Sequence, residues 1–334
     1  MIQRTFRLYA FHGSAGARKR LVGHVVRKVT GRAGPTFLDI AVTYRCQCRC
    51  VHCSATAQQC DAADELTTSE LKSVIDAARR LGVLEVIFSG GEPLLRPDMP
   101  ELVRHARDAG LLTRLNTNGL LLTRENVAEL KRAGVTQCAV SIDDADPAVH
   151  DRLRGLSGLH AKATEGVRIL HEFGIPCQIL TYASRENVTV GLERIIKQGR
   201  ELGAFAVFIF FPIAAGRWDG SFDKVLTQEE RERVRELQDM GFVHLELPIS
   251  DTLCCTYDGA VLHVTARGDV TPCPFVPFAF GNVREFALDT LWERYIEGMK
   301  LDCRGECPMN SAESRRQLND YVDEIGAGNS ADPK

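Results

Sequence analysis

The stretch that decides the fold is FLDIAVTYRCQCRCVHC, residues 37–53. Its first half, Phe37–Tyr44, is an apolar run rich in β-branched and aromatic residues, which predicts a buried strand. Thiols follow this strand directly at Cys46, Cys50 and Cys53, in the spacing Cys-x3-Cys-x2-Cys. Three thiolates from one tight loop fill three of the four iron sites of a 4Fe-4S cube. The fourth iron is then left open, as a catalytic metal requires.

A zinc site is the alternative reading of the same loop. Zinc favours four protein ligands, commonly from two paired Cys-x2-4-Cys units. Cys48 and Cys60 would complete such a set. The thiol at Cys48 also allows a second ligand spacing in the loop, Cys46-x-Cys48-x-Cys50. The loop alone leaves both readings open.

The first apolar run opens a series of six that alternate with helical patterns. The six runs are Phe37–Tyr44, Val83–Ser89, Leu111–Asn116, Thr136–Ile142, Pro176–Ala183 and Phe205–Phe211. Capping patterns such as Thr67 with Glu70 mark where the helices begin. Alternating strands and helices predict an α/β fold with a parallel sheet and helices outside it. Six units are short of a closed barrel, so we expect a partial (β/α)6 TIM-type barrel with its chemistry at the C-terminal strand ends.

Composition narrows the class of protein. The chain has 334 residues, 44% hydrophobic and 25% charged, with a formal net charge of −3, so no nucleic-acid partner is expected. No apolar run approaches the roughly 18–20 residues that span a bilayer, and Met1–Gly13 lacks the pattern of a secretory signal. The twelve cysteines crowd into 46–60 and 254–307, which indicates metal or cluster ligation in a reducing cytoplasm.

The first 35 residues form a basic arm that holds eight Lys or Arg residues and no acidic residue. Three interpretations stay open: a transit segment, an arm that contacts an acidic partner or a membrane surface, and a solvated basic helix.

Polar motifs follow the next strands. Ser89-Gly90-Gly91-Glu92-Pro93 closes the second strand, where two glycines allow close approach to the backbone and a carboxylate can accept hydrogen bonds from an ammonium group. Asn118 and Ser141 lie at the ends of the third and fourth strands, at the same edge of the expected barrel.

Together the cysteine loop and the Gly-Gly-Glu-Pro motif resemble the radical S-adenosylmethionine (SAM) enzymes. The resemblance implies that SAM chelates the open iron and is cleaved to a 5′-deoxyadenosyl radical, which abstracts a hydrogen atom from a substrate. It also implies SAM-binding roles for His52 near the adenine and for Arg154 as a partner of the SAM carboxylate. The full implied set is His52, Gly90, Gly91, Glu92, Asn118, Ser141 and Arg154.

The C-terminal cysteines resemble the auxiliary-cluster extensions called SPASM and twitch. Twelve residues separate Cys255 from Gly268, and the spacing Gly-x4-Cys leads to Cys273. The resemblance implies a second 4Fe-4S cluster on Cys273, Cys303, Cys307 and one of Cys254 or Cys255. The thiol left over, for which we take Cys255, is a candidate hydrogen donor to a substrate radical, and a zinc knuckle is the alternative to the cluster.

The chain is therefore expected to have four parts: a basic arm at 1–35 and a polar tail at 313–334, which composition indicates, and a radical SAM barrel at 36–240 and an auxiliary-cluster domain at 241–312, which the resemblance implies. The resemblance implies an enzyme that acts on a peptide or small natural product and draws electrons from a flavodoxin or ferredoxin. Alternatives are a radical alcohol dehydrogenase or epimerase acting on a sugar, a cofactor or haem maturation enzyme and, outside catalysis, an iron–sulfur or zinc sensor or scaffold.

Overall fold

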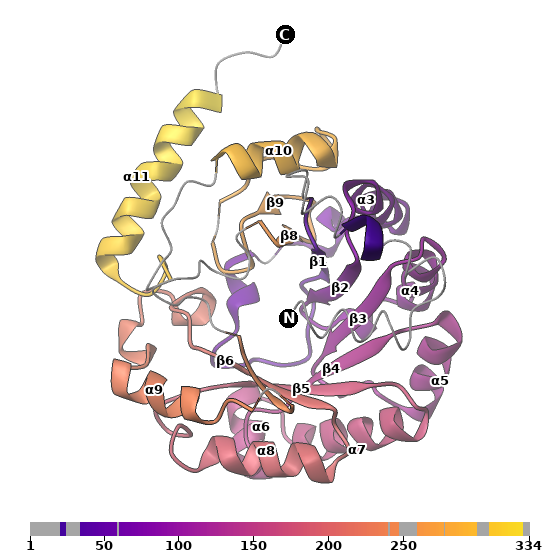
Figure 1. Cartoon of the computed structure of the whole chain (residues 1–334), viewed down its shortest axis with the longest axis vertical. Coiled ribbons are helices and arrows are strands. Elements are labelled where there is room, and N and C mark those ends of the chain that lie inside the picture. Colours follow the sequence, from indigo (N-terminus) through magenta and orange to yellow (C-terminus); the bar gives the residue numbers. More distant parts are fainter. Residues whose placement is uncertain are drawn as a thin grey trace.

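A computed structural model describes residues 21–24, 34–58, 60–239, 241–246, 259–276, 278–298 and 307–329. Most of the basic arm and the candidate ligands Cys254, Cys255 and Cys303 therefore lie outside the described residues. Within them, nine strands form one sheet in the order β7-β6-β5-β4-β3-β2-β1-β8-β9, curved around a central space with helices outside it (Figure 1).

The six predicted strands are confirmed, and each pairs in parallel with its neighbour. They are β1 Phe37–Thr43, β2 Glu85–Gly90, β3 Leu112–Thr117, β4 Gln137–Ser141, β5 Cys177–Tyr182 and β6 Ala206–Phe210. The two end strands of the described sheet do not pair with each other, so the barrel is partial, as expected.

Helices follow the strands and cover the outside of the sheet. They are α3 Thr68–Leu81, α4 Met99–Asp108, α5 Arg124–Ala133, α6 Pro147–Arg154, α7 Leu159–Glu172, α8 Gly191–Glu201 and α9 Gln228–Glu236. The capping box of Thr67 and Glu70 forms as predicted, with the Thr67 side chain accepting from the Glu70 backbone and the Glu70 side chain accepting from the Thr67 backbone.

Strand β1 shows how alternation divides the barrel into two environments. Leu38, Ile40 and Val42 are fully buried in the hydrophobic core that also includes helix residues such as Ile75 of α3. Side chains of alternate residues point to opposite faces of a strand. Asp39 and its neighbours on that face therefore turn toward the barrel interior, where the cavity described below lies.

Three strands extend the sheet beyond the six predicted ones. β8 Val261–Val264 and β9 Val270–Thr271 form a hairpin, and β8 also pairs in parallel with β1 and so joins the barrel. On the opposite edge β7 Val243–Glu246 pairs in parallel with β6. Strands β7 and β8 have four residues each, which is too few for hydrophobic periodicity to reveal the strands they pair with.

The C-terminal part packs against the barrel through helices α10 Leu288–Gly298 and α11 Ala312–Asn329. Leu318 of α11, in the segment expected as a polar tail, is buried in a small cluster with Ile213 and Met309. No helix of the described residues is long and apolar enough to cross a membrane.

Part of the basic arm contacts the barrel. Residues 21–24 are helical, and Leu21 packs against Leu84 and Leu112 at the N-terminal ends of β2 and β3. His24 is buried, with its Nδ1 atom 3.2 Å from the Gly82 carbonyl oxygen and its Nε2 atom 3.2 Å from Thr36 Oγ1.

An ion pair joins the C-terminal part to helix α3 and makes stability depend on pH. The Arg284 Nε atom lies 2.7 Å from Glu70 Oε1, and this bond, with the Thr67 backbone N–H, lowers the pKa of Glu70 from 4.5 to about 2. The ionised carboxylate therefore stabilises the fold above pH 4.5, and this contribution disappears as the pH falls through about 2.

We predict that Glu70→Gln lowers the free energy of unfolding by up to about 1 kcal/mol at neutral pH, because the partly exposed ion pair with Arg284 is lost while glutamine can keep the capping hydrogen bond. In urea titrations, the difference in free energy of unfolding between the variant and wild type should become smaller as the pH falls from about 4.5 toward about 2. The surface variant Glu129→Gln is the control. A difference in free energy of unfolding that does not change with pH would contradict a stabilising role for the ionised Glu70 carboxylate.

Candidate active site

The loop after β1 is held by backbone hydrogen bonds to helix α6. The Arg49 N–H donates to the Arg154 carbonyl at 2.9 Å, and the Val51 N–H donates to the Leu153 carbonyl at 2.9 Å. The loop therefore uses carbonyl groups at the C-terminal end of α6 that have no partner within the helix. This attachment sets the positions of the three thiols: Cys46 is exposed, Cys50 is buried and Cys53 is half-buried.

The three thiols line one cavity of about 520 Å³ at the C-terminal ends of the strands. Its wall also contains six of the seven residues to which the sequence assigns SAM-binding roles: His52, Gly90, Gly91, Asn118, Ser141 and Arg154. The structure thus brings together residues that are up to about a hundred positions apart in sequence.

The charge state of two of the three thiols suits iron ligation, whereas burial raises the pKa of the third, Cys53. A hydrogen bond from Cys48 lowers the pKa of Cys46 to about 7 and that of Cys50 to about 6, and Arg154 Nη1 lies 3.7 Å from the Cys50 sulfur. Thiolates are the form that binds metal. The same hydrogen bonds raise the pKa of Cys48, so this thiol keeps its proton between the other two.

Among the described residues, no three His, Cys, Asp or Glu side chains are gathered closely enough to hold one metal ion. The ligation of a cluster by Cys46, Cys50 and Cys53 stays a prediction, as does the alternative set with Cys48 and Cys60.

The two glycines after β2 are required by the close approach of two backbones. Gly90 has φ +119°, and a Cβ atom there would lie 2.2 Å from the Thr43 carbonyl oxygen. A Cβ atom on Gly91 would lie 2.3 Å from the Arg45 carbonyl oxygen. Any larger residue would push the β2 turn away from the cysteine loop.

Glu92 supports the site from behind the cavity wall. Its side chain is fully buried, accepts hydrogen bonds from Thr117 Oγ1 at 2.9 Å and the Asn118 N–H at 2.8 Å, and is absent from the cavity lining. Burial raises the pKa of Glu92 to about 7 despite these bonds. The carboxylate thus fixes the turn after β3 and holds Asn118, whose amide Nδ2 lies 3.8 Å from the Cys46 sulfur.

His52 belongs to a buried cluster that sequence analysis found only in part. Its Nε2 atom lies 3.5 Å from Asp143 Oδ2, and its ring centroid is 4.6 Å from that of Tyr182 and 5.7 Å from that of Trp218. Burial lowers the pKa of His52 to about 4, so its ring is neutral at physiological pH. The aromatic partners were missed because they come from β5 and from the loop after β6, which only the fold brings together.

Arg154 has its own partner within the structure. Its Nε atom lies 2.6 Å from Asp143 Oδ2, and its Nη2 atom donates to Asp143 Oδ1 at 2.8 Å. Burial opposes the charge, but Asp143 and the Cys50 sulfur raise the pKa of Arg154 above its usual value. Its expected pairing with the SAM carboxylate stays a prediction.

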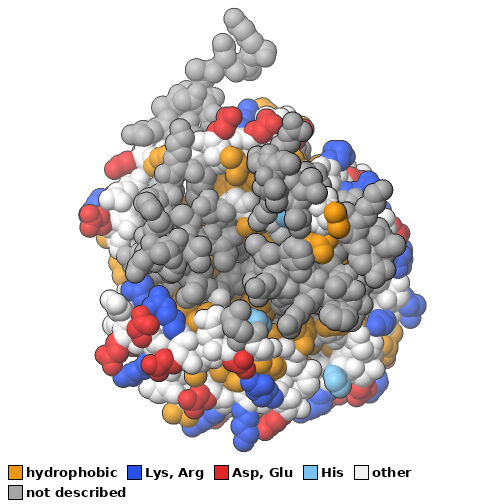
Figure 2. Space-filling model, viewed as in Figure 1, with side chains coloured by type: hydrophobic (Ala, Val, Ile, Leu, Met, Phe, Trp, Pro, Cys, Tyr) orange, Lys and Arg blue, Asp and Glu red, His pale blue; other side chains and the backbone are white. Residues whose placement is uncertain are grey.

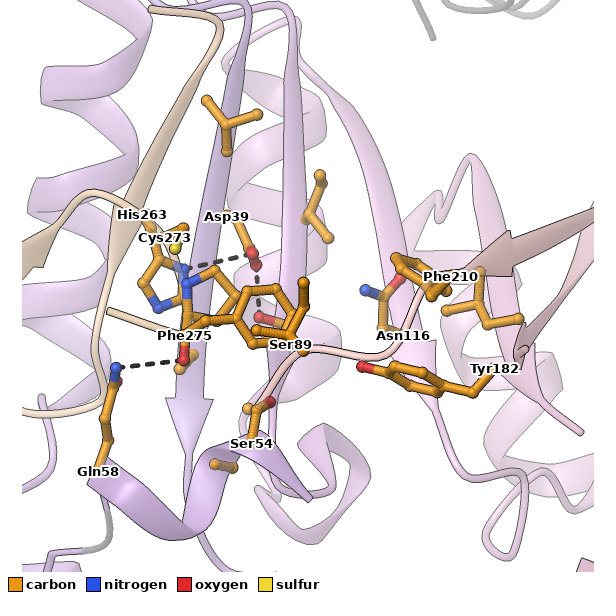
Figure 3. A pocket seen from close by; sticks show the side chains of 18 of the residues that line it. Asp39, Ser54, Gln58, Ser89, Asn116, Tyr182, Phe210, His263, Cys273 and Phe275 are labelled. Carbon is orange, nitrogen blue, oxygen red and sulfur yellow. Dashed lines mark hydrogen bonds and ion pairs between the residues drawn. The ribbon is translucent and has the colours of Figure 1, made fainter. Parts of the chain in front are cut away.

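A second cavity of about 230 Å³ lies deeper in the barrel and shares wall residues such as Ser89, Asn116 and Tyr182 with the first (Figure 3). Cys273 and Cys307, two of the expected auxiliary-cluster ligands, are buried beside it and line its wall. The inner cavity therefore connects the cysteine loop to the C-terminal thiols.

On the face shown in Figure 2, the charged side chains of the described residues are of mixed sign. Basic and acidic side chains alternate around the rim of this face, and hydrophobic side chains lie closer to the middle. This agrees with the small net charge of −3.

Comparisons with known proteins agree with the geometry. A model of the radical SAM superfamily matches residues 40–188, and one of an iron–sulfur cluster-binding domain (SPASM) matches residues 254–310. An AdoMet-dependent heme synthase of Methanosarcina barkeri is 33% identical over 309 residues, covering 82% of this chain and 87% of the relative. A PqqA peptide cyclase of Gluconobacter oxydans is 31% identical, covering 77% of this chain and 76% of the relative.

Among solved structures, Streptococcus suis SuiB bound to precursor peptide SuiA has a TM-score of 0.68 at 17% sequence identity. The match covers 88% of this chain and 76% of that chain. At 17% sequence identity, this similarity shows that the two proteins share a fold and nothing further.

We predict that Gly91→Ala lowers the iron and sulfide content per chain after anaerobic reconstitution, because the added methyl group displaces the cysteine loop at a cost of about 1–3 kcal/mol. Gly23→Ala is the control, since nothing lies within 4 Å of a Cβ atom at that position. A Gly91→Ala protein that retains full cluster content and SAM affinity would show that the close approach is unimportant.

Proposed function

The chain belongs to the radical SAM superfamily and carries the SPASM-type extension, and from this premise we propose that it acts on a haem precursor. It is an enzyme that binds SAM and a 4Fe-4S cluster, with further iron–sulfur binding in its extension. When bound, the reduced cluster and SAM together supply the 5′-deoxyadenosyl radical that abstracts a hydrogen atom from the substrate.

We infer that Cys46, Cys50 and Cys53 ligate the SAM-binding cluster. The support is their shared cavity and the lowered pKa of two of the thiols. Asn118 near the Cys46 sulfur and Arg154 near the Cys50 sulfur would tune this cluster by donating to its ligand atoms.

SAM would occupy the rest of the same cavity. We assign its adenine to the aromatic surface of His52 and Tyr182, its amino group to the turn at Gly90 and Gly91, and its ribose and carboxylate to the side of Ser141 and Asn118. Glu92 holds that wall in place through the turn after β3. Arg154 holds it through Asp143 and is also the proposed partner of the SAM carboxylate.

The second cluster would be ligated by Cys273 and Cys307 with Cys303 and one of Cys254 and Cys255. The division into an arm at 1–35, a barrel at 36–240, a cluster domain at 241–312 and a tail at 313–334 follows the same proposal. Cys255 as hydrogen donor remains a hypothesis, because it lies outside the described residues.

The haem-precursor proposal is carried by the extent of the heme synthase match. That match covers 82% of this chain and 87% of the relative, so it is long enough to include both barrel and extension. Aromatic side chains wall the inner cavity, whose volume of about 230 Å³ would receive one edge of a flat apolar macrocycle. They are Tyr44, Tyr182, Phe210, Phe211 and Phe275.

A peptide is the second candidate substrate. The PqqA peptide cyclase of Gluconobacter oxydans covers 77% of this chain, nearly as much as the heme synthase match, and the fold is shared with SuiB bound to a precursor peptide.

We also propose a flavodoxin or ferredoxin as the electron donor and a cytoplasmic location, because a reduced cluster needs a low-potential donor and a reducing compartment. Contact of the basic arm with a membrane surface remains part of the proposal, supported by its eight basic residues.

The test is substrate-dependent turnover of the reconstituted enzyme with SAM and a strong reductant, without oxygen. We expect a panel of iron porphyrins that differ from haem only in their peripheral side chains to yield haem, detected by mass spectrometry, together with 5′-deoxyadenosine. If the enzyme modifies PqqA peptide and changes none of the porphyrins, the haem-precursor proposal is wrong and a peptide is the substrate.

A further inference from the structure

The loop that follows β6 forms part of the wall of both cavities. We call residues 212–219, which include the short 3-10 helix Gly216–Trp218, the β6 loop. Ile213 lines the inner cavity, and Arg217 lines the larger cavity that contains the thiols of the cysteine loop. The β6 loop has no strand and only this one short helix, so its position depends on the groups that it contacts on either side.

On one side the β6 loop lies against the end of the cysteine loop. The Arg217 N–H donates to the Cys53 carbonyl oxygen at 3.0 Å. Gly216 has φ +62°, and a Cβ atom there would lie 2.2 Å from the same oxygen, so the close approach requires glycine. The ring centroid of Trp218 is 5.7 Å from that of His52, to which we assign the SAM adenine. The β6 loop therefore supports both Cys53 and the adenine side of the cavity.

On its other side the β6 loop is held by Asn310 of the C-terminal extension. This side chain is buried, and its amide bonds to the backbone of the loop at two points. The Asn310 Oδ1 atom accepts from the Ala214 N–H at 3.0 Å, and Nδ2 donates to the Pro212 carbonyl at 3.3 Å. The Asn310 N–H donates to the Cys307 carbonyl at 2.8 Å. One amide thus joins the β6 loop to the segment of an expected auxiliary-cluster ligand.

Arg315 of α11 provides a second attachment, from a helix whose first turn lies near the segment that follows β6 (Figure 1). Its Nη2 atom donates to the Ala214 carbonyl and lies 2.5 Å from Asp219 Oδ1. Its Nε atom donates to the Met309 carbonyl at 3.2 Å. The guanidinium therefore bridges the β6 loop and the turn before α11, in a part of the chain that composition alone indicates as a polar tail.

From these contacts we propose that Asn310 and Arg315 are positioning residues for SAM. They hold the β6 loop against Cys53 and His52, and so the C-terminal extension shapes the adenine side of the SAM cavity. Neither Asn310 nor Arg315 lines either cavity, so both act through the loop. The inference rests on SAM binding by this family and is the same for a haem precursor and for a peptide substrate.

The test measures SAM binding by the anaerobically reconstituted enzyme without a reductant, so that no turnover occurs. Equilibrium dialysis gives the Kd for SAM, and the iron content and the urea midpoint of unfolding are measured on the same preparations. We expect Asn310→Ala and Arg315→Gln to bind SAM about fivefold more weakly than wild type at an unchanged iron content. Arg316→Gln, at the exposed arginine next along α11, is the matched control and should bind SAM as wild type does.

A double variant tests whether Arg315 acts through the β6 loop. Trp218→Leu removes the ring contact with His52 and should by itself weaken SAM binding. If both changes act through the same loop, Arg315→Gln should weaken SAM binding by a smaller factor in the Trp218→Leu background than in wild type.

Each outcome decides the proposal. It is overturned by an unchanged SAM affinity in both single variants, by an equal loss in Arg316→Gln, or by effects of Arg315→Gln and Trp218→Leu that simply multiply. Failure of both Asn310→Ala and Arg315→Gln to take up iron also overturns it, because the extension would then support the barrel as a whole. No substrate takes part in these measurements, so any of these results leaves the haem-precursor proposal standing.

Discussion

The buried pair of Asp143 and Arg154 is the interaction on which the active site depends. The two side chains meet at 2.6 and 2.8 Å, and the same arginine reaches the Cys50 sulfur with its side chain and the Arg49 N–H with its carbonyl group. One residue thus joins the end of β4, the end of α6 and the cysteine loop. Removal of one partner from such a pair leaves a buried charge, which commonly costs about 3–5 kcal/mol.

The rest of the site is arranged around that loop by close backbone approach. Gly90 and Gly91 let the turn after β2 lie against the chain between Thr43 and Arg45, and Glu92 then reaches across to hold the turn after β3. Three consecutive residues thereby connect three strands. Rigid support of this kind is needed because a radical must form where only the intended C–H bond is within reach.

Periodicity and spacing predicted the barrel and the cysteine loop because both signals are local. The six strand runs and the Cys-x3-Cys-x2-Cys spacing can be read from short windows. The parallel pairing of β8 with β1, which brings His263 to Asp39, depends on partners more than two hundred residues apart and was missed. Glu92 was correctly placed at the site, but only the structure shows that it faces a neighbouring turn.

Arg114 is a second example of a feature that local sequence signals do not predict. Its apolar neighbours in sequence predict a strand, and nothing in that strand reveals a charge facing the barrel interior. Register with β2 and β4 places Arg114 beside Ile87 and Gln137 in the wall of the inner cavity, and only then does its ion pair with Glu85 become visible. The set of side chains that line the inner cavity is therefore determined by strand register, which sequence periodicity alone does not specify.

The most direct test of the account is the production of 5′-deoxyadenosine from SAM by anaerobically reconstituted enzyme with a strong reductant. Wild type and Cys48→Ala should both form it, because Cys48 only donates a hydrogen bond between two ligands. The variant with Cys46, Cys50 and Cys53 all replaced by alanine should form none. Loss of activity in Cys48→Ala together with cluster retention in the triple variant would contradict the assignment of the cluster to these three thiols.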